Sequence, residues 1–122
     1  MEQNLYTYKA HVDRVVDADT LSVRIDVGFY FAFSAEIRLL RINAYETKLG
    51  KNTTADQKVK GLAGKAYVMQ LLADKDIIVR TVLDKEKFGR VLGDVYYKDA
   101  AGVWVCLNDD LVTRGYAIYQ AY

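Results

Sequence analysis

The sequence predicts a mainly β domain of the α+β class: a small five-stranded barrel with one helix after the third strand and a short helix near the carboxyl terminus. Residues 6–16, 20–29 and 35–42 alternate apolar and polar side chains with period two, as half-buried strands do. Residues 55–73 change to a spacing of three and four, and a short punctuated segment follows at 108–115. A chain of 122 residues is long enough to bury about two-thirds of its unfolded surface, so we expect one domain over residues 1–122.

Three successive strands are predicted over residues 6–16, 20–29 and 35–42. The alternation is clearest at 20–29, where every second side chain is apolar. Residues 17–19 form the first turn, and Gly28 marks the end of the second strand or a bulge. Strands joined by turns this short favour a meander that curls into a barrel.

A helix is predicted over residues 55–73, after a polar, glycine-containing loop at 47–56. The expected buried face consists of apolar residues at helical spacing: Val59, Leu62, Ala66, Met69 and Ala73. Gly61 and Gly64 lie inside this helix, where each costs about 1 kcal/mol relative to alanine. We expect close packing of the helix on the barrel to explain them.

The remaining elements are two further strands and a short helix. The strands are predicted at residues 77–82 and 91–97, and an apolar run at 103–107 leads into the helix. The helix is predicted over Asp109–Arg114, with Asn108 as its N-cap and Gly115 as its stop. Five main strands with a helix after the third and a closing helix match an OB-type barrel.

The composition gives no general attraction to polyanions, because the net charge is only +1. Affinity for nucleic acid would have to come from a local arrangement of side chains. No stretch is apolar enough for a signal peptide or a membrane span. We therefore expect an intracellular, cytoplasmic protein with no membrane association, or a secreted one whose leader was removed.

Two single residues are given structural interpretations. Cys106 lies in an apolar run and has no second cysteine to pair with, so a small buried thiol is favoured over a nucleophile. His11 is interpreted as a surface strand residue, because no second histidine or cysteine is placed to join it in a metal site.

Charged side chains lie where the predicted strands begin or end. Asp19 lies in Val-Val-Asp-Ala-Asp-Thr at 15–20, Arg38 opens Arg-Leu-Leu-Arg-Ile-Asn-Ala-Tyr-Glu-Thr-Lys, and Arg90 closes Lys-Phe-Gly-Arg. Taken alone, Asp-x-Asp-Thr is usually a structural turn, and Phe-Gly-Arg is a weak signal. Together, each beside a predicted strand, they indicate a β-scaffold that delivers polar side chains to one cleft.

In this order the three segments resemble the staphylococcal nuclease (thermonuclease) family, whose pattern is Asp-Gly-Asp-Thr, then Arg-Leu-x-x-Ile/Val-Asp-Thr-Pro-Glu, then Tyr-Gly-Arg. The likeness covers roughly residues 8 to 119. It implies the OB-type barrel as well. It also implies a calcium-dependent, sugar-nonspecific nuclease that hydrolyses DNA and RNA phosphodiester bonds, prefers single strands and leaves 3′-phosphate products.

The resemblance also implies roles for individual residues. Asp19, Asn43 and the backbone carbonyl of Ala44 match the calcium ligands, all of them hard oxygen donors. Glu46 matches the residue that activates or orients the attacking water. Arg38 and Arg90 match the arginines that grip the scissile phosphate, for which the rigid guanidinium fork is well suited.

Five further residues match the family pattern or could act in substrate binding. Lys87 and Phe88 match the family's Lys-Tyr pair, although Phe88 lacks the hydroxyl group. Carboxyl-proximal tyrosines, here Tyr116, Tyr119 and Tyr122, could stack on a base.

Further departures from the family pattern lie near the proposed metal site. Asn43 stands where the family most often has aspartate, so the site lacks one negative charge and should bind calcium more weakly. Tyr45 replaces the proline before Glu46, which loosens the loop that carries the proposed base. Ala18 replaces glycine, which is harmless unless that residue needs a positive φ.

A non-catalytic OB-type module that binds nucleic acid or another phosphate-bearing partner is the alternative, with metal binding impaired by Asn43. A third hypothesis is a purely structural barrel that mediates assembly. Arg38, Glu46 and Arg90 together favour the enzyme, since a binding module has no evident use for a base between two arginines. We expect a monomer, with a dimer as the alternative.

Overall fold

The computed structural model describes residues 6–45, 55–83 and 90–120. Its elements, in chain order, are β1 (Thr7–Asp17), β2 (Thr20–Gly28), β3 (Phe31–Leu39), β4 (Ile42–Ala44), α1 (Ala55–Leu72), β5 (Asp76–Leu83), β6 (Arg90–Lys98), β7 (Trp104–Cys106), α2 (Leu107–Thr113) and β8 (Ala117–Tyr119).

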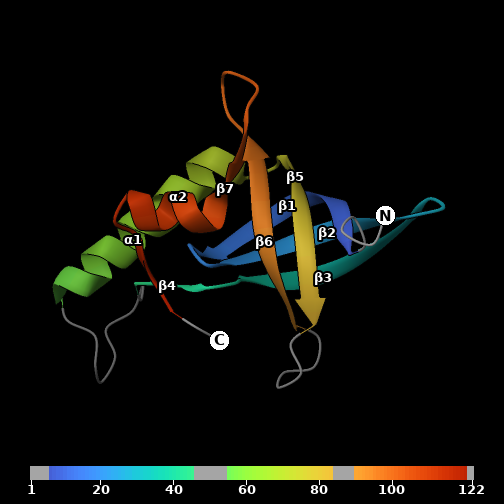
Figure 1. Cartoon of the computed structure of the whole chain (residues 1–122). Coiled ribbons are helices and arrows are strands. Elements are labelled where there is room, and N and C mark those ends of the chain that lie inside the picture. Colours follow the sequence, from blue (N-terminus) through green and yellow to red (C-terminus); the bar gives the residue numbers. More distant parts are fainter. Residues whose placement is uncertain (1–5, 46–54, 84–89, 121–122) are drawn as a thin grey trace.

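Five strands close into a barrel (Figure 1). The hydrogen-bonded order is β3, β2, β1, β5 and β6, and a parallel pairing of β6 with β3 completes the ring. Strand β7 pairs with β6 outside the ring. The mainly β, OB-type barrel expected from the sequence is confirmed.

Alternating inward side chains of these strands fill the barrel. The largest fully buried residues of these strands are Leu21, Ile37, Leu39 and Ile77, with Val12, Val23 and Val79; Ile42 of β4, Val68 and Leu72 of α1, and Leu107 and Leu111 of α2 are buried with them. The period-two pattern of the sequence therefore identified the core-facing side of β1 and β2 correctly.

The third strand differs from its prediction. It runs over Phe31–Leu39 instead of 35–42 and is followed by a turn at residues 40–41. Arg41 has a φ of +67°, and its guanidinium contacts Asp94 at 3.0 Å and Asp109 at 3.2 Å. The strand therefore ends at a turn whose arginine forms ion pairs with distant residues. The alternation of side chains in the sequence gives no sign of this turn.

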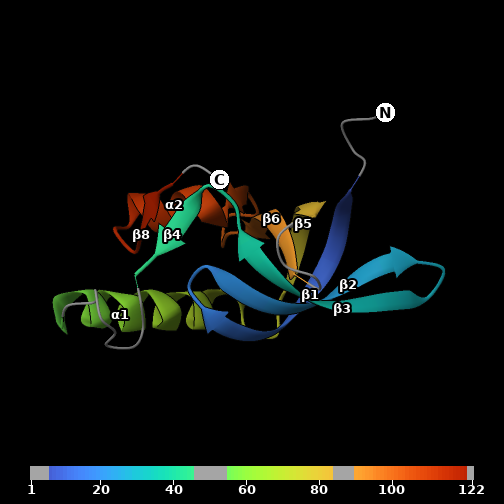
Figure 2. The ribbon, with the colours of Figure 1, turned by 90° about the horizontal axis from the view of Figure 1, so that it is seen from below.

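After this turn the chain forms a second, two-stranded sheet. Strand β4 pairs antiparallel with β8, with Asn43 opposite Ile118 and Ala44 opposite Ala117. This pairing, which the sequence analysis did not include, brings the carboxyl-terminal segment beside residues 42–44 (Figure 2).

The extent of the first helix was predicted well, but its buried face was not. Val59, Leu62 and Met69 are exposed, by 65%, 48% and 47%, whereas Gly61, Gly64, Val68 and Leu72 are buried. A side chain at Gly64 would place its Cβ 3.1 Å from the Cβ of Tyr116 and 3.4 Å from that of Ala18. This spacing is tighter than ordinary side-chain contact, which confirms the close packing expected at Gly64; Gly61 is buried on the same helix.

The second helix begins at Leu107, and Asn108 is not its N-cap. Cys106 occupies that position, without a side-chain capping bond. Gly115 ends the helix as predicted: its φ is +83°, its N–H donates to the Val112 carbonyl, and the next N–H donates to that of Leu111.

The β2–β3 hairpin projects beyond the barrel (Figures 1 and 2). Gly28, Phe29 and Tyr30 form its turn with φ values of +86°, +55° and +66°. The register also shifts between Asp26 and Gly28, so Gly28 both ends the strand and lies at a bulge, as predicted. None of the described helices is long and apolar enough to cross a membrane.

Candidate active site

Asp19 lies at the β1–β2 turn with only 8% of its surface exposed. Both of its carboxylate oxygens are engaged: Oδ1 accepts from the Thr20 hydroxyl at 3.1 Å, and Oδ2 accepts from the Ala44 backbone N–H at 2.9 Å. A buried carboxylate needs such donors, because removing a charge from water is costly unless it is paired. The turn thus holds one fixed negative charge beside β4.

Arg38 connects this carboxylate to Asn43. Its Nη1 lies 3.3 Å from Asp19 Oδ2, and its Nη2 donates to Asn43 Oδ1 at 3.2 Å. Nη1 also donates to the Leu39 carbonyl at 3.0 Å. The guanidinium is therefore held on three sides, and only 11% of the Arg38 side chain is exposed.

Strand pairing explains why these residues meet. Arg38 is directly opposite Thr20, the residue after Asp19, in the β2–β3 register. Asn43 follows the break at Arg41, which turns the chain back toward Arg38. Asp19, Arg38, Asn43 and Ala44, four of the residues selected from the sequence, thus lie together.

Thr20 was quoted in the first motif but assigned no role in the sequence analysis. Its signal was its place immediately after Asp19, where a hydroxyl can reach the neighbouring carboxylate. Ala18, which replaces the family's glycine, has no positive φ and is buried, so that replacement is tolerated without strain.

The other site residues are only partly within the described chain. Arg90 is the first residue of β6, and its backbone pairs with Glu36 of β3, the strand that also carries Arg38. The Arg90 side chain lies outside the described part. Glu46, Lys87, Phe88 and Tyr122 also lie outside the described residues.

Tyr119 is described, and it does not join the cluster. It is opposite Ile42 in the β4–β8 pair, whereas Asn43 is opposite Ile118, so successive side chains place Tyr119 and Asn43 on opposite faces of the ribbon. The Tyr119 hydroxyl donates to Asp109 at 3.1 Å, and this bond raises the pKa of Tyr119. Tyr116 contacts the Tyr67 ring instead, with the two centroids 5.3 Å apart.

The donor set suits a hard cation. Asp19 supplies a carboxylate, Asn43 an amide oxygen and Ala44 a backbone carbonyl, the oxygen types that calcium prefers. Asp19 Oδ2 and Asn43 Oδ1 also converge on one positive group, the Arg38 guanidinium. The described residues contain no cluster of three or more histidine, cysteine, aspartate or glutamate side chains suited to a metal, so a cation here would depend on the amide and carbonyl.

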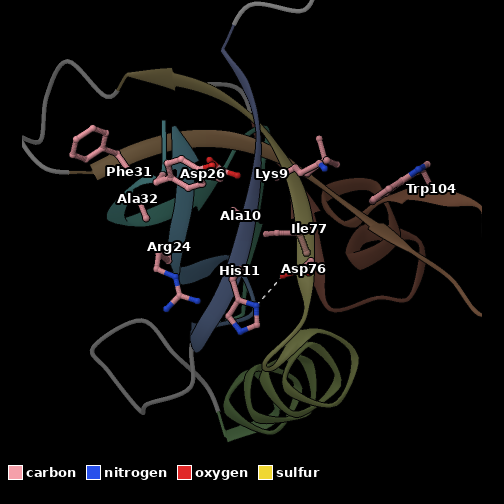
Figure 3. A pocket seen from close by; sticks show the side chains of 12 residues that line it. Lys9, Ala10, His11, Arg24, Asp26, Phe31, Ala32, Asp76, Ile77 and Trp104 are labelled. Atoms are coloured by element: carbon pink, nitrogen blue, oxygen red, sulfur yellow. Dashed lines mark hydrogen bonds and ion pairs between the residues drawn. The ribbon is translucent and has the colours of Figure 1, made fainter. Parts of the chain in front are cut away.

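A depression of about 500 Å³ lies elsewhere, on the outer face of the sheet (Figure 3). Asp19, Arg38 and Asn43 are not among the residues that line it. Its charged side chains have both signs, with Lys9 and Arg24 beside acidic residues, so it offers no strong attraction to phosphate.

Comparison with known proteins gives one family. The sequence model of the family described as "Staphylococcal nuclease homologue" matches residues 36–122, which include Arg38, Asn43 and Arg90. None of the curated proteins compared with the chain matches it.

Proposed function

The chain belongs to the staphylococcal nuclease homologue family, and from this premise we propose that it is a metal-dependent, sugar-nonspecific nuclease that hydrolyses DNA and RNA phosphodiester bonds. In this proposal Asp19, Asn43 and the Ala44 carbonyl hold calcium, and Arg38 and Arg90 bind the scissile phosphate. Glu46 activates or orients water. By resemblance, the substrate is preferentially single-stranded and the products carry 3′-phosphates.

The observation that carries the proposal is the contact of one arginine with both side-chain metal ligands. Arg38 lies 3.3 Å from Asp19 and donates to Asn43 at 3.2 Å. A phosphate placed against this guanidinium would also lie beside the two oxygen donors. Substrate binding and cation binding would thus share one small region.

The chain's own residues have distinct tasks. The buried Asp19 supplies a carboxylate at the proposed calcium site, and hydrogen bonds from Thr20 and the Ala44 N–H fix the orientation of that carboxylate. Arg38 is oriented by the Leu39 carbonyl, which leaves less conformational freedom to lose when phosphate binds. When bound, calcium would neutralise the charge that develops on the phosphate oxygens and favour deprotonated water.

A non-catalytic nucleic-acid-binding module remains the second candidate, on a specific observation. Arg38 already contacts Asp19 Oδ2 and donates to Asn43 Oδ1, so the charge of Asp19 is compensated without a metal. Asn43 also contributes no charge to attract one. Such a module would bind phosphate through its arginines and leave the bond intact.

The two functions are separated by a cleavage assay on single-stranded DNA, duplex DNA and RNA with calcium, magnesium or chelator. We expect calcium-dependent cleavage that falls at least about 100-fold in Glu46→Gln and in Arg38→Ala, as removing a charge-stabilising group does. Arg80→Ala, which removes an exposed arginine of β5, is the matched control and should keep full activity.

Because Arg38→Ala leaves the buried Asp19 without its partner, Arg38→Lys and an unfolding curve accompany it. A folded Arg38→Lys protein with strongly reduced cleavage supports the phosphate role, since lysine keeps the charge but loses the fork. Tight binding without cleavage under every metal condition would favour the binding module instead.

A further inference from the structure

Among the residues that the structure describes, the outer half of β3 is paired on one side only. Strand β6 pairs with β3 only from Glu36 to Leu39, and within the described chain no strand pairs with that edge between Phe31 and Ala35. All residues from Phe31 to Ser34 are exposed. This half of the strand lies on the hairpin that extends beyond the barrel (Figure 2).

The backbone groups that face this edge can be identified from two hydrogen bonds. The Leu39 N–H donates to the Asp19 carbonyl on one side of β3, and the Leu40 N–H donates to the Gly93 carbonyl of β6 on the other. Because directions alternate along a strand, and the β2–β3 register is regular from residue 32 to 38, Ala32 and Ser34 present their N–H and C=O groups to the free edge.

Residues 27–35 carry neither of the side-chain types that most often protect such an edge. Residues 27–35 contain no charged side chain and no proline, and residues 29, 31 and 33 are phenylalanine. The exposed fractions of Phe31 and Phe33 are 70% and 54%. Natural edge strands usually carry lysine, proline or a bulge to prevent pairing, and an edge without them is a template for another strand.

We propose that two copies of this chain pair through this edge, antiparallel, about a two-fold axis at Phe33. An antiparallel pair of identical strands is self-complementary, as a two-fold dimer requires. Ala32 then forms a hydrogen-bonded pair with the partner's Ser34, and Ser34 with the partner's Ala32. The free backbone groups of both edges are thereby satisfied.

On the outer face of the sheet this register places unlike charges in the same row, about 14 Å apart across the strands, so their contribution is small and screened by salt. Arg24 is opposite Ser34 in β2–β3, and Asp26 is opposite Ala32. With the axis at Phe33, each row across the dimer runs from Arg24 over two small residues to the partner's Asp26. An axis at residue 32 would align Asp26 with the partner's Asp26, and one at residue 34 would align the two arginines.

The other face of the pair is apolar. Phe33 is opposite the buried Ile25, so it lies on the core-facing side of the sheet, beyond the region that the barrel covers. At the axis, Phe33 faces the partner's Phe33 in a non-hydrogen-bonded pair, the arrangement in which cross-strand side chains are closest. Two exposed rings would cover each other there.

Analytical ultracentrifugation of the full chain tests the proposal. We expect a concentration-dependent dimer that Phe33→Lys converts to monomer, because two ammonium groups would meet at the axis. Val59→Lys, at an exposed apolar residue of α1, is the matched control and should leave the dimer intact. A wild-type protein that stays monomeric up to about 1 mM, or a dimer unaffected by Phe33→Lys, would overturn the proposal.

Cysteine cross-linking tests the register and does not depend on the stability of Phe33→Lys. In a Cys106→Ser background, Phe33→Cys should give a reducible covalent dimer, since residues 33 would lie about 4.5 Å apart at Cα. Phe31→Cys should not, because residue 31 would face the partner's Ala35, leaving the two cysteines about 14 Å apart. Efficient cross-linking through residue 31 but not 33 would exclude this register.

A charge exchange tests the outer face. Arg24→Asp alone should weaken the dimer about threefold, and Arg24→Asp combined with Asp26→Arg should restore it, because the rows regain opposite charges. Equal weakening in the single and the double variant would contradict the charge argument.

Discussion

The Arg38 guanidinium donates to the amide oxygen of Asn43 at 3.2 Å. This contact joins a residue proposed to bind phosphate to one proposed to bind calcium. An uncharged amide oxygen thus serves as one of the three groups that hold Arg38, beside Asp19 and the Leu39 carbonyl. We therefore expect the missing negative charge at Asn43 to weaken calcium binding without changing the position of Arg38.

Asn43→Asp should bind calcium about tenfold more tightly than the wild-type protein. The substitution adds a negative charge next to Asp19 while keeping the oxygen that Arg38 contacts, and tenfold corresponds to about 1.4 kcal/mol. Isothermal titration calorimetry with calcium measures it. An unchanged dissociation constant would mean that residue 43 is not a calcium ligand.

Tyr119→Phe should keep cleavage within about twofold of wild type. Its hydroxyl is bonded to Asp109, and its side chain lies on the opposite face of the β4–β8 ribbon from Asn43. The loss of one exposed hydrogen bond should lower the free energy of unfolding by only about 0.5–1 kcal/mol. A large rise in KM for single-stranded DNA would instead indicate that Tyr119 binds substrate.

Local patterns predicted the strands because alternation of side chains is a property of the strand itself. The buried face of α1 was mispredicted because contact with the barrel selects the helix side with the smallest residues, and Gly61 and Gly64 carry no hydrophobic signal. Asn108 was taken for an N-cap because a polar residue before a helix has the same local appearance whether it caps the helix or bonds to the barrel. Asp19 and Arg38 were found because they lie in polar motifs beside apolar strand-like runs, and Asn43 was found only through the resemblance to the family pattern.

Gly64→Val should destabilise the domain by about 2–3 kcal/mol. The new Cβ would lie 3.1 Å from the Cβ of Tyr116 and 3.4 Å from that of Ala18, and its methyl groups have no space. Ala63→Val, on the exposed side of the same helix, is the control and should change stability by about 0.5 kcal/mol. Urea unfolding of both variants measures the difference; equal effects would show that the helix can move away from Tyr116.

Asn108→Leu should destabilise the domain by about 3 kcal/mol or more. Asn108 is fully buried and joins α2 to the barrel: its Oδ1 accepts from the Val95 N–H at 3.0 Å, and its Nδ2 donates to the Leu40 carbonyl at 2.8 Å and to the Gly93 carbonyl at 3.2 Å. Leucine has similar volume but leaves these backbone groups without that partner. Thr113→Ala, exposed at the end of α2, is the control for chemical denaturation and should stay within about 0.5 kcal/mol. A small loss in Asn108→Leu would mean that water replaces the amide.

His11 should titrate above its ordinary pKa of 6.5. Hydrogen bonds from Nδ1 to Asp76 at 2.9 Å (Figure 3) and from Nε2 to Asp74 at 2.8 Å raise the pKa, because only the protonated ring can donate to both carboxylates. His11 is the one histidine of the chain, so its ring signals in an NMR titration are assigned without ambiguity. Asp74→Asn combined with Asp76→Asn should bring the pKa back toward 6.5, and high salt should lower it in the wild-type protein because both aspartates are exposed.

The same shift fixes the pH dependence of stability. A group whose pKa is higher in the folded than in the unfolded chain binds more protons when folded, so its contribution is complete below pH 6.5 and is lost as the pH rises through the raised folded value. The stability of the wild-type protein relative to His11→Gln should therefore decline above pH 6.5. Urea midpoints of both proteins measured across that range test this, and a difference that grows with pH would show that the neutral ring is the form that the fold prefers.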